Sequence, residues 1–87
     1  MMYELLFTKQ AQKDWQKLKQ SNLDKNAKSL IELIRIAPFS YPLGYETLVG
    51  DLKGAYSRRI NIQRRLVYSA DQDKMIVRVL RMWTHYE

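Results

Sequence analysis

The sequence predicts an α+β fold in which two helices pack on one face of a small, twisted, mostly antiparallel sheet, with elements in the order βααβββ. Three observations predict it. A short apolar run is followed by two segments with helical periodicity, a loop rich in proline and glycine comes next, and three strand-like segments complete the chain. With 87 residues there is room for one domain, residues 1–87, and one modest core.

The first strand is expected over the apolar residues 3–7 and should pass directly into a helix, because Thr8 is a good N-cap. The apolar residues of this first helix recur at helical spacing and should face the core: Ala11, Trp15 and Leu18.

Ser21 and Asn22 interrupt that pattern, and a second helix should follow. It should end by Ala37, because Pro38 disfavours helical geometry in the residue before it. Its core-facing residues are Leu23, Ala27, Leu30, Ile31 and Ile34.

Both prolines and all three glycines lie between residues 38 and 54, which predicts a structured loop. Strands should follow over residues 55–61, 65–70 and 75–82, with a polar turn at 70–74. Because these connections are short, the three strands should form an antiparallel meander.

Six of the seven arginines lie between residues 58 and 81. Strand alternation places Arg58 on the core side and Arg59 on the open side of the sheet. For Arg65 to share the face of Arg59, the hairpin loop must be odd in length, for example residues 62–64 with Asn61 opposite Arg65.

The formal charge of +6 and the sequence pI near 9.7 favour a polyanion as partner, although an acidic protein would also fit. The chain has no cysteine and one histidine, so disulfides, thiolate metal sites and histidine-rich zinc sites are excluded, and we expect no metal or cofactor. Neither a signal-peptide pattern nor a long apolar span is visible, which predicts a soluble cytoplasmic protein without a membrane partner.

Cleavage of RNA without a metal needs a base for the 2′-hydroxyl proton, a cation for the phosphorane and an acid for the departing 5′-oxygen. Glu46, Arg65 and His85 are one set that could supply these groups. An unperturbed histidine titrates near pH ~6.5 and can donate a proton at cellular pH. Neighbouring arginines would lower the pKa of Glu46 and keep it ionised.

The chain resembles the YoeB/Txe toxins of type II toxin–antitoxin systems, a branch of the RelE/ParE superfamily. The segments that carry the resemblance are Tyr45-Glu46-Thr47-Leu48, Leu52-Lys53-Gly54-Ala55-Tyr56-Ser57-Arg58-Arg59-Ile60, Arg64-Arg65-Leu66-Val67-Tyr68 and His85-Tyr86. The resemblance covers nearly the whole chain and implies a single RelE-like microbial ribonuclease domain. It also implies a ribosome-dependent endoribonuclease that cuts messenger RNA in the A site and leaves a 2′,3′-cyclic phosphate.

By this resemblance, Glu46 is the general base, Arg65 stabilises the transition-state phosphate and His85 is the general acid. Arg59 and Tyr86 match residues that hold the substrate.

The chain departs from the family pattern at two positions. Val49 stands where the family often has a lysine, and Lys53 is the candidate to replace that charge in substrate binding. Glu87 extends the chain beyond the usual His-Tyr ending, and its carboxylates would raise the pKa of His85 if they pointed inward.

The resemblance implies three macromolecular partners: a YefM/Axe-like antitoxin with an acidic disordered C-terminal segment, the 70S ribosome, and messenger RNA. Operator DNA would be contacted only through the antitoxin complex, and the sequence leaves open whether the free toxin is a homodimer. Two alternatives remain: a non-enzymatic inhibitor of DNA gyrase of the ParE type, and a basic RNA-binding module that has lost its chemistry.

Overall fold

A computed structural model describes residues 2–39, 46–47 and 55–85. The elements run in the order β1 (Glu4–Phe7), α1 (Lys9–Gln20), α2 (Asp24–Ile36), β2 (Glu46–Thr47), β3 (Ala55–Arg59), β4 (Arg64–Asp71) and β5 (Ile76–His85).

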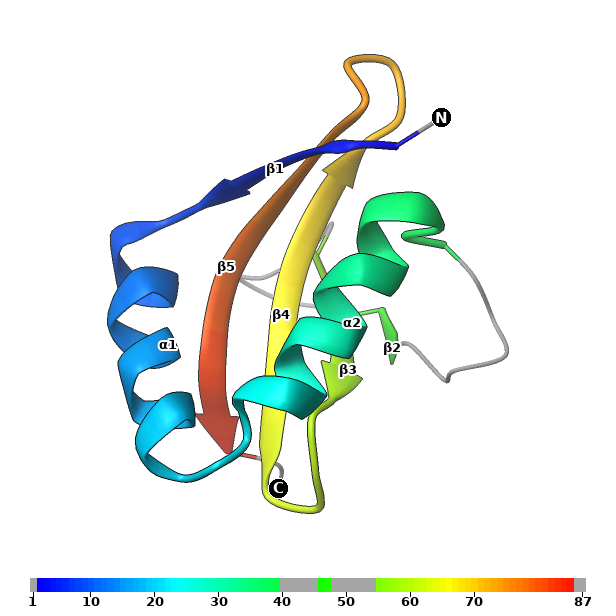
Figure 1. Ribbon diagram of the computed structural model, residues 1–87. Helices are drawn as coiled ribbons and strands as arrows, with labels where there is room; N and C mark the ends of the chain where they lie inside the picture. Colours follow the sequence, from blue (N-terminus) through cyan, green and yellow to red (C-terminus); the bar gives the residue numbers. More distant parts are fainter. Residues whose placement is uncertain (1, 40–45, 48–54, 86–87) are drawn as a thin grey trace.

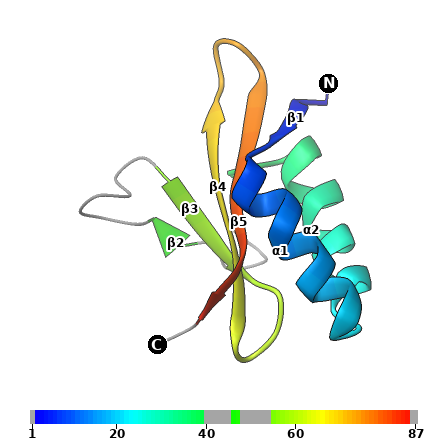
Figure 2. The same ribbon diagram turned by 90° about the vertical axis from the view of Figure 1, so that its left-hand side faces the viewer.

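The five strands form one mixed sheet in the order β1-β5-β4-β3-β2. β1 runs parallel to β5, and the other neighbouring pairs are antiparallel. Both helices lie on the same face of this sheet (Figures 1 and 2), so the predicted α+β architecture is confirmed. The short strand β2 was not predicted, because two residues are too few to show an alternating pattern.

The helix boundaries agree with the sequence signals. Thr8 caps α1, with its Oγ1 accepting a hydrogen bond from the backbone N–H of Ala11 at 3.0 Å. Asn22, in the link between the helices, has a φ of 59°, a left-handed conformation that asparagine tolerates well. The second helix ends at Ile36, two residues before Pro38, as predicted.

The core lies between the helices and the covered face of the sheet. Trp15, Leu23 and Leu30, which periodicity assigned to the core, are half-buried and pack against its margin. The buried residues of this core are Tyr3, Ala11, Leu18, Ala27, Ile31, Ile34, Ile60, Leu66, Tyr68, Val77, Val79 and Met82.

The hairpin between β3 and β4 has an odd loop, as the shared face of the two arginines requires, but its register differs from the example predicted. Arg59, not Asn61, lies opposite Arg65. The backbone N–H of Ile60 donates to the carbonyl of Arg64, which leaves a three-residue loop over 61–63. Asn61 decides this register, because its side-chain oxygen accepts from the backbone N–H groups of Gln63 and Arg64 at 2.9 and 2.7 Å.

The pairing of β5 with β4 shifts register twice, once between the partners of Arg65 and Val67 and once between the partners of Val67 and Tyr68. Between the pairs formed by Val79 and Arg81, β5 advances two residues while β4 advances one, so Leu80 is an extra residue. The N-cap of α1 and a residue in the middle of that helix satisfy the backbone there. The Thr8 hydroxyl donates to the carbonyl of Leu80 at 2.7 Å, and Asp14 accepts from the N–H of Met82 at 2.9 Å.

Asp14 is therefore a structural carboxylate that the sequence did not reveal. It is 2% exposed, and its second oxygen accepts from the Gln10 side chain at 2.8 Å. A charged residue in an amphipathic helix ordinarily faces solvent, and only the bulge in β5 explains why this one is buried.

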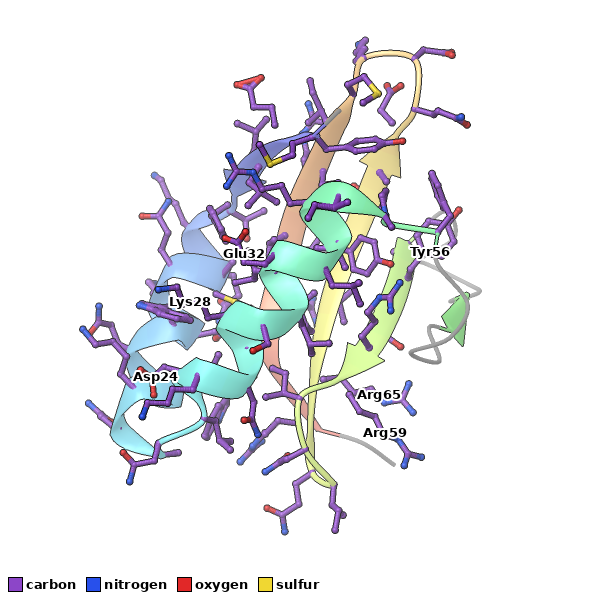
Figure 3. All side chains as sticks on the ribbon, turned by 45° about the vertical axis from the view of Figure 1, so that its right-hand side comes forward. Asp24, Lys28, Glu32, Tyr56, Arg59 and Arg65 are labelled. Carbon is purple, nitrogen blue, oxygen red and sulfur yellow. The ribbon has the colours of Figure 1, made fainter. Side chains whose placement is uncertain are left out.

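The outer side of α2 carries an alternating row of charges, Asp24, Lys28 and Glu32, spaced four residues apart (Figure 3). Glu32 lies 3.9 Å from Arg35 Nη1, one turn further along the helix. Within the residues described here, no helix combines the length and the apolar character needed to cross a membrane.

Candidate active site

Arg59 and Arg65 lie side by side on the sheet face that the helices do not cover, which we call the open face (Figure 3). The two residues are register partners on β3 and β4 and therefore share a face. Arg59 is exposed, whereas Arg65 is half-buried. The sequence-based prediction that these two arginines share a face is confirmed.

Ser57 holds the guanidinium of Arg65. Arg65 Nη1 donates to the Ser57 hydroxyl oxygen at 3.0 Å, and Ser57 is only 1% exposed. Glu46 in β2 is the register partner of Ser57. The hydrogen bond thus runs diagonally from Arg65 toward the row of the sheet that contains Glu46.

The end of β5 borders the same arginine on its other side. Thr84 is the register partner of Arg65, and His85 is the partner of Arg64. Glu46 and His85 therefore stand on strands that flank the β3–β4 pair. For these two residues, the structure describes the backbone and not the side chains, so their catalytic roles remain predictions.

Two further arginines occupy the open face and were not predicted to do so. Arg78 lies opposite Ser69 and Arg81 lies opposite Val67, and both arginines are exposed. Simple alternation would put residues 78 and 81 on opposite faces, because they are three positions apart. The extra residue at Leu80 brings them to the same face.

Arg64 belongs to the margin of the site. Its guanidinium lies 3.8 Å from the centre of the Trp83 ring, and its Nη1 donates to the Trp83 carbonyl at 3.5 Å. Trp83 is half-buried and packs against the core. The stacked pair fastens the start of β4 to the end of β5.

Arg58, next to Arg59 in the sequence, serves a structural network on the covered face. It is 1% exposed, and its Nε donates to the Tyr68 hydroxyl at 3.3 Å. Tyr68 in turn donates to the carbonyl of Pro38. The network therefore secures the point where the chain leaves α2 toward Glu46.

Four positions singled out in the sequence lie outside the described residues: Val49, Lys53, Tyr86 and Glu87. The proposed substrate contacts of Lys53 and Tyr86 remain predictions.

An apolar cavity of about 380 Å³ lies on the helix side of the sheet, away from the open-face arginines. Trp15, Ile31, Met82 and Phe7 contribute its apolar lining. None of the described residues in its wall carries a charge, which makes it a poor site for a phosphate.

The sequence from residue 7 to residue 86 matches the family model described as the YoeB-like toxin of bacterial type II toxin–antitoxin systems. No curated protein matches the chain.

Solved structures resemble the fold closely. The YoeB/ParE toxin from Agrobacterium tumefaciens is 26% identical, with a TM-score of 0.84 over 95% of this chain and 99% of that one. The YoeB dimer from Staphylococcus aureus is 29% identical, with a TM-score of 0.82 over 99% of this chain and 100% of that one. The YoeB–YefM complex from the same organism gives 30% identity and a TM-score of 0.78 over the same shares.

Proposed function

Because it matches that family over residues 7–86, the chain belongs to the YoeB-like toxins of bacterial type II toxin–antitoxin systems, and we propose that it is a ribosome-dependent messenger RNA endonuclease. One observation carries the proposal: the paired arginines Arg59 and Arg65 lie on the open face, between the strands that contain Glu46 and His85. The proposal assigns the base to Glu46 on β2 and the acid to His85 at the end of β5, on either side of this cation pair.

In the proposed reaction, the Glu46 carboxylate takes the proton of the ribose 2′-hydroxyl in the A site. The 2′-oxygen then attacks the adjacent phosphorus, and the negative charge that develops is stabilised by the Arg65 guanidinium. His85 gives its proton to the 5′-oxygen as the phosphorus–oxygen bond breaks. The products are a 2′,3′-cyclic phosphate and a free 5′-hydroxyl, and no step requires a metal.

Arg59 supports this reaction as a second cation on the same face. Its planar fork matches the geometry of a phosphate, and its exposure keeps it accessible to a nucleic acid chain. The half-buried Arg65 is better suited to the transition state, because a group held in place and partly removed from water interacts more strongly with developing charge.

The partners proposed for the chain are an antitoxin, the ribosome and messenger RNA in the cytoplasm. A net charge of +6 complements both an acidic antitoxin segment and ribosomal RNA. The complex of a YoeB with YefM from Staphylococcus aureus supports an antitoxin of that type.

The test is cleavage of a translated message by the purified protein, mapped by primer extension on stalled ribosomes. Cuts should fall in the A-site codon and should end in a 2′,3′-cyclic phosphate. The variant His85→Gln is the matched control: it should lose about 100-fold or more in cleavage rate, while ribosome binding persists because it depends on charges spread over the surface. Intact message with normal translation would refute the proposal.

A second candidate is the inhibition of DNA gyrase, favoured by the name of the Agrobacterium tumefaciens relative, which joins YoeB with ParE. Supercoiling by purified gyrase distinguishes the two. Inhibition of gyrase while messenger RNA stays whole would support this second function and exclude the first.

A further inference from the structure

We propose that Ser57 is a positioning residue for Arg65: its buried hydroxyl holds the guanidinium on the side of the open face nearest to Glu46. The expected effect on catalysis rests on the proposed nuclease function. The ordering of the Arg65 side chain by Ser57 can be measured without any activity.

The register of the sheet shows what this hydrogen bond does. Arg65 has Arg59 as its partner across the strand pair, so the guanidinium could extend along that row toward solvent. It turns instead by one diagonal step to Ser57, a neighbour that the long arginine side chain can reach. Ser57 has Glu46 as its own partner on the next strand. Glu46 and Ser57 form one row of paired residues across the sheet, and Arg65 and its β5 partner Thr84 form the next. The contact therefore places the guanidinium between these two rows.

Among the described residues, the contact with Arg65 is the one feature that explains a serine at this position. Ser57 is 1% exposed in the middle of β3, and its partner in β4 is the buried Val67. A β-branched aliphatic residue would fit such a strand better, and a serine hydroxyl is a poor contributor to packing. The hydroxyl provides an acceptor for the guanidinium, and it keeps its own proton for donation to a third group.

Fixing the guanidinium matters because arginine loses much rotamer freedom when it becomes ordered. A cation already held in place stabilises the transition state without first having to be oriented. Loss of the Ser57 acceptor should therefore lower kcat by about 10-fold while KM changes little, since the charge itself remains.

Ser57→Ala is the informative variant, and Ser69→Ala is its matched control. Ser69 lies on the same face, opposite Ala55 and two residue pairs along the β3–β4 ladder from Ser57, and has no hydrogen bond to an arginine among the described contacts. Ser57→Ala should slow cleavage about 10-fold and Ser69→Ala should not. In an Arg65→Gln background, Ser57→Ala should have no further effect, because the group that it positions is gone.

Equal slowing in both backgrounds would show a merely structural role and would overturn the inference. If Ser57→Ala does not fold, Ser57→Cys replaces it, because the thiol preserves the side-chain volume and is a weak acceptor.

Nitrogen-15 relaxation of Arg65 Nε in the isolated toxin separates this inference from the proposed function. The order parameter should fall in Ser57→Ala and stay unchanged in Ser69→Ala. If the wild-type protein cuts no RNA, the nuclease proposal fails, yet the relaxation data still decide whether Ser57 holds Arg65. An Arg65 side chain that is equally ordered in all three proteins would reject the inference.

Discussion

Arg58 and Arg59 are adjacent in the sequence, yet the two faces of the sheet give them opposite surroundings. Arg58 is buried on the helix side and contacts Tyr68. Arg59 is exposed on the open side, beside Arg65. On the covered face, Arg58 joins β3, β4 and the end of α2, whereas the arginines of the open face lie on the side of the sheet that the helices leave uncovered. The same residue type therefore supports the fold on one face and the proposed chemistry on the other.

This contrast leads to an expectation about mutations. Changes on the open face should affect activity more than stability, and changes on the covered face should affect stability first. Single substitutions on each face test this division.

The largest effect is expected from Arg65→Gln. Removing a cation aimed at the developing phosphorane charge should lower kcat about 100- to 1000-fold. The midpoint of thermal unfolding should change little, because Arg65 is not part of the hydrophobic core. Single-turnover cleavage and calorimetry on the same preparations measure both quantities. A large loss of stability would show that the open face also supports the fold.

The reciprocal change is Arg58→Ala on the covered face. It removes a buried guanidinium and the hydrogen bond to Tyr68, which should lower the free energy of unfolding by about 3 kcal/mol. Urea unfolding followed by tryptophan fluorescence measures the loss. Cleavage at a temperature where the variant is folded should remain within a few-fold of the wild type, and a catalytic loss equal to that of Arg65→Gln would contradict the division.

Asp14→Ala should lower both stability and activity, because Asp14 holds the backbone of β5 where the register of that strand shifts. The variant leaves the buried N–H of Met82 without its acceptor, at a cost of about 1–3 kcal/mol. Cleavage should also fall, since the bulge sets the positions of Arg81 and of the strand end that carries His85. Asp14→Asn keeps an oxygen acceptor and should lose less on both measures, and Asp73→Ala in the exposed turn is the control. Equal losses from Asp14→Asn and Asp14→Ala would argue against the hydrogen bond as the cause.

The smallest effect is expected from Arg81→Gln, measured as the salt dependence of ribosome or RNA binding. If Arg81 contacts a phosphate, the slope of log K against log salt should decrease in magnitude by about 1. Lys28→Gln, on the exposed side of α2 (Figure 3), provides the comparison for a cation on the other face. Identical slopes for both variants and the wild type would exclude Arg81 from the phosphate contacts.

Much of the fold could be predicted because its signals are local. The cap at Thr8, the stop before Pro38 and the apolar periodicity of both helices each depend on residues close in sequence. Alternation also separated Arg58 from Arg59, and the parity requirement on the hairpin was met. The register itself could not be predicted, because it depends on how the Asn61 side chain bonds within the loop.

The candidate site was predicted less completely than the fold. The bulge at Leu80 is the main reason that Arg78 and Arg81 were not assigned to the open face. Leu80 moves Arg81 to the face of Arg78, and its backbone is held by Thr8 and Asp14, residues that lie far away in the sequence. No local sequence pattern predicts an irregularity that depends on contacts between the first helix and the last strand. The role of Ser57 could not be predicted for a similar reason, because its burial and its contact with Arg65 arise only when the strands are paired.

The amino-acid sequence by itself was enough to establish the class of fold, the positions of its helices, the assignment of Arg59 and Arg65 to a common face, and the resemblance to the YoeB-like toxins. These follow from periodicity and from short motifs, which local backbone preferences and side-chain alternation control. Tertiary structure alone decided the register of Arg59 opposite Arg65, the burial of Asp14, the gathering of four arginines on the open face and the anchoring of Arg65 by Ser57. Each of these depends on contacts between segments distant in the chain, where one extra residue in a strand reverses the face on which a side chain lies.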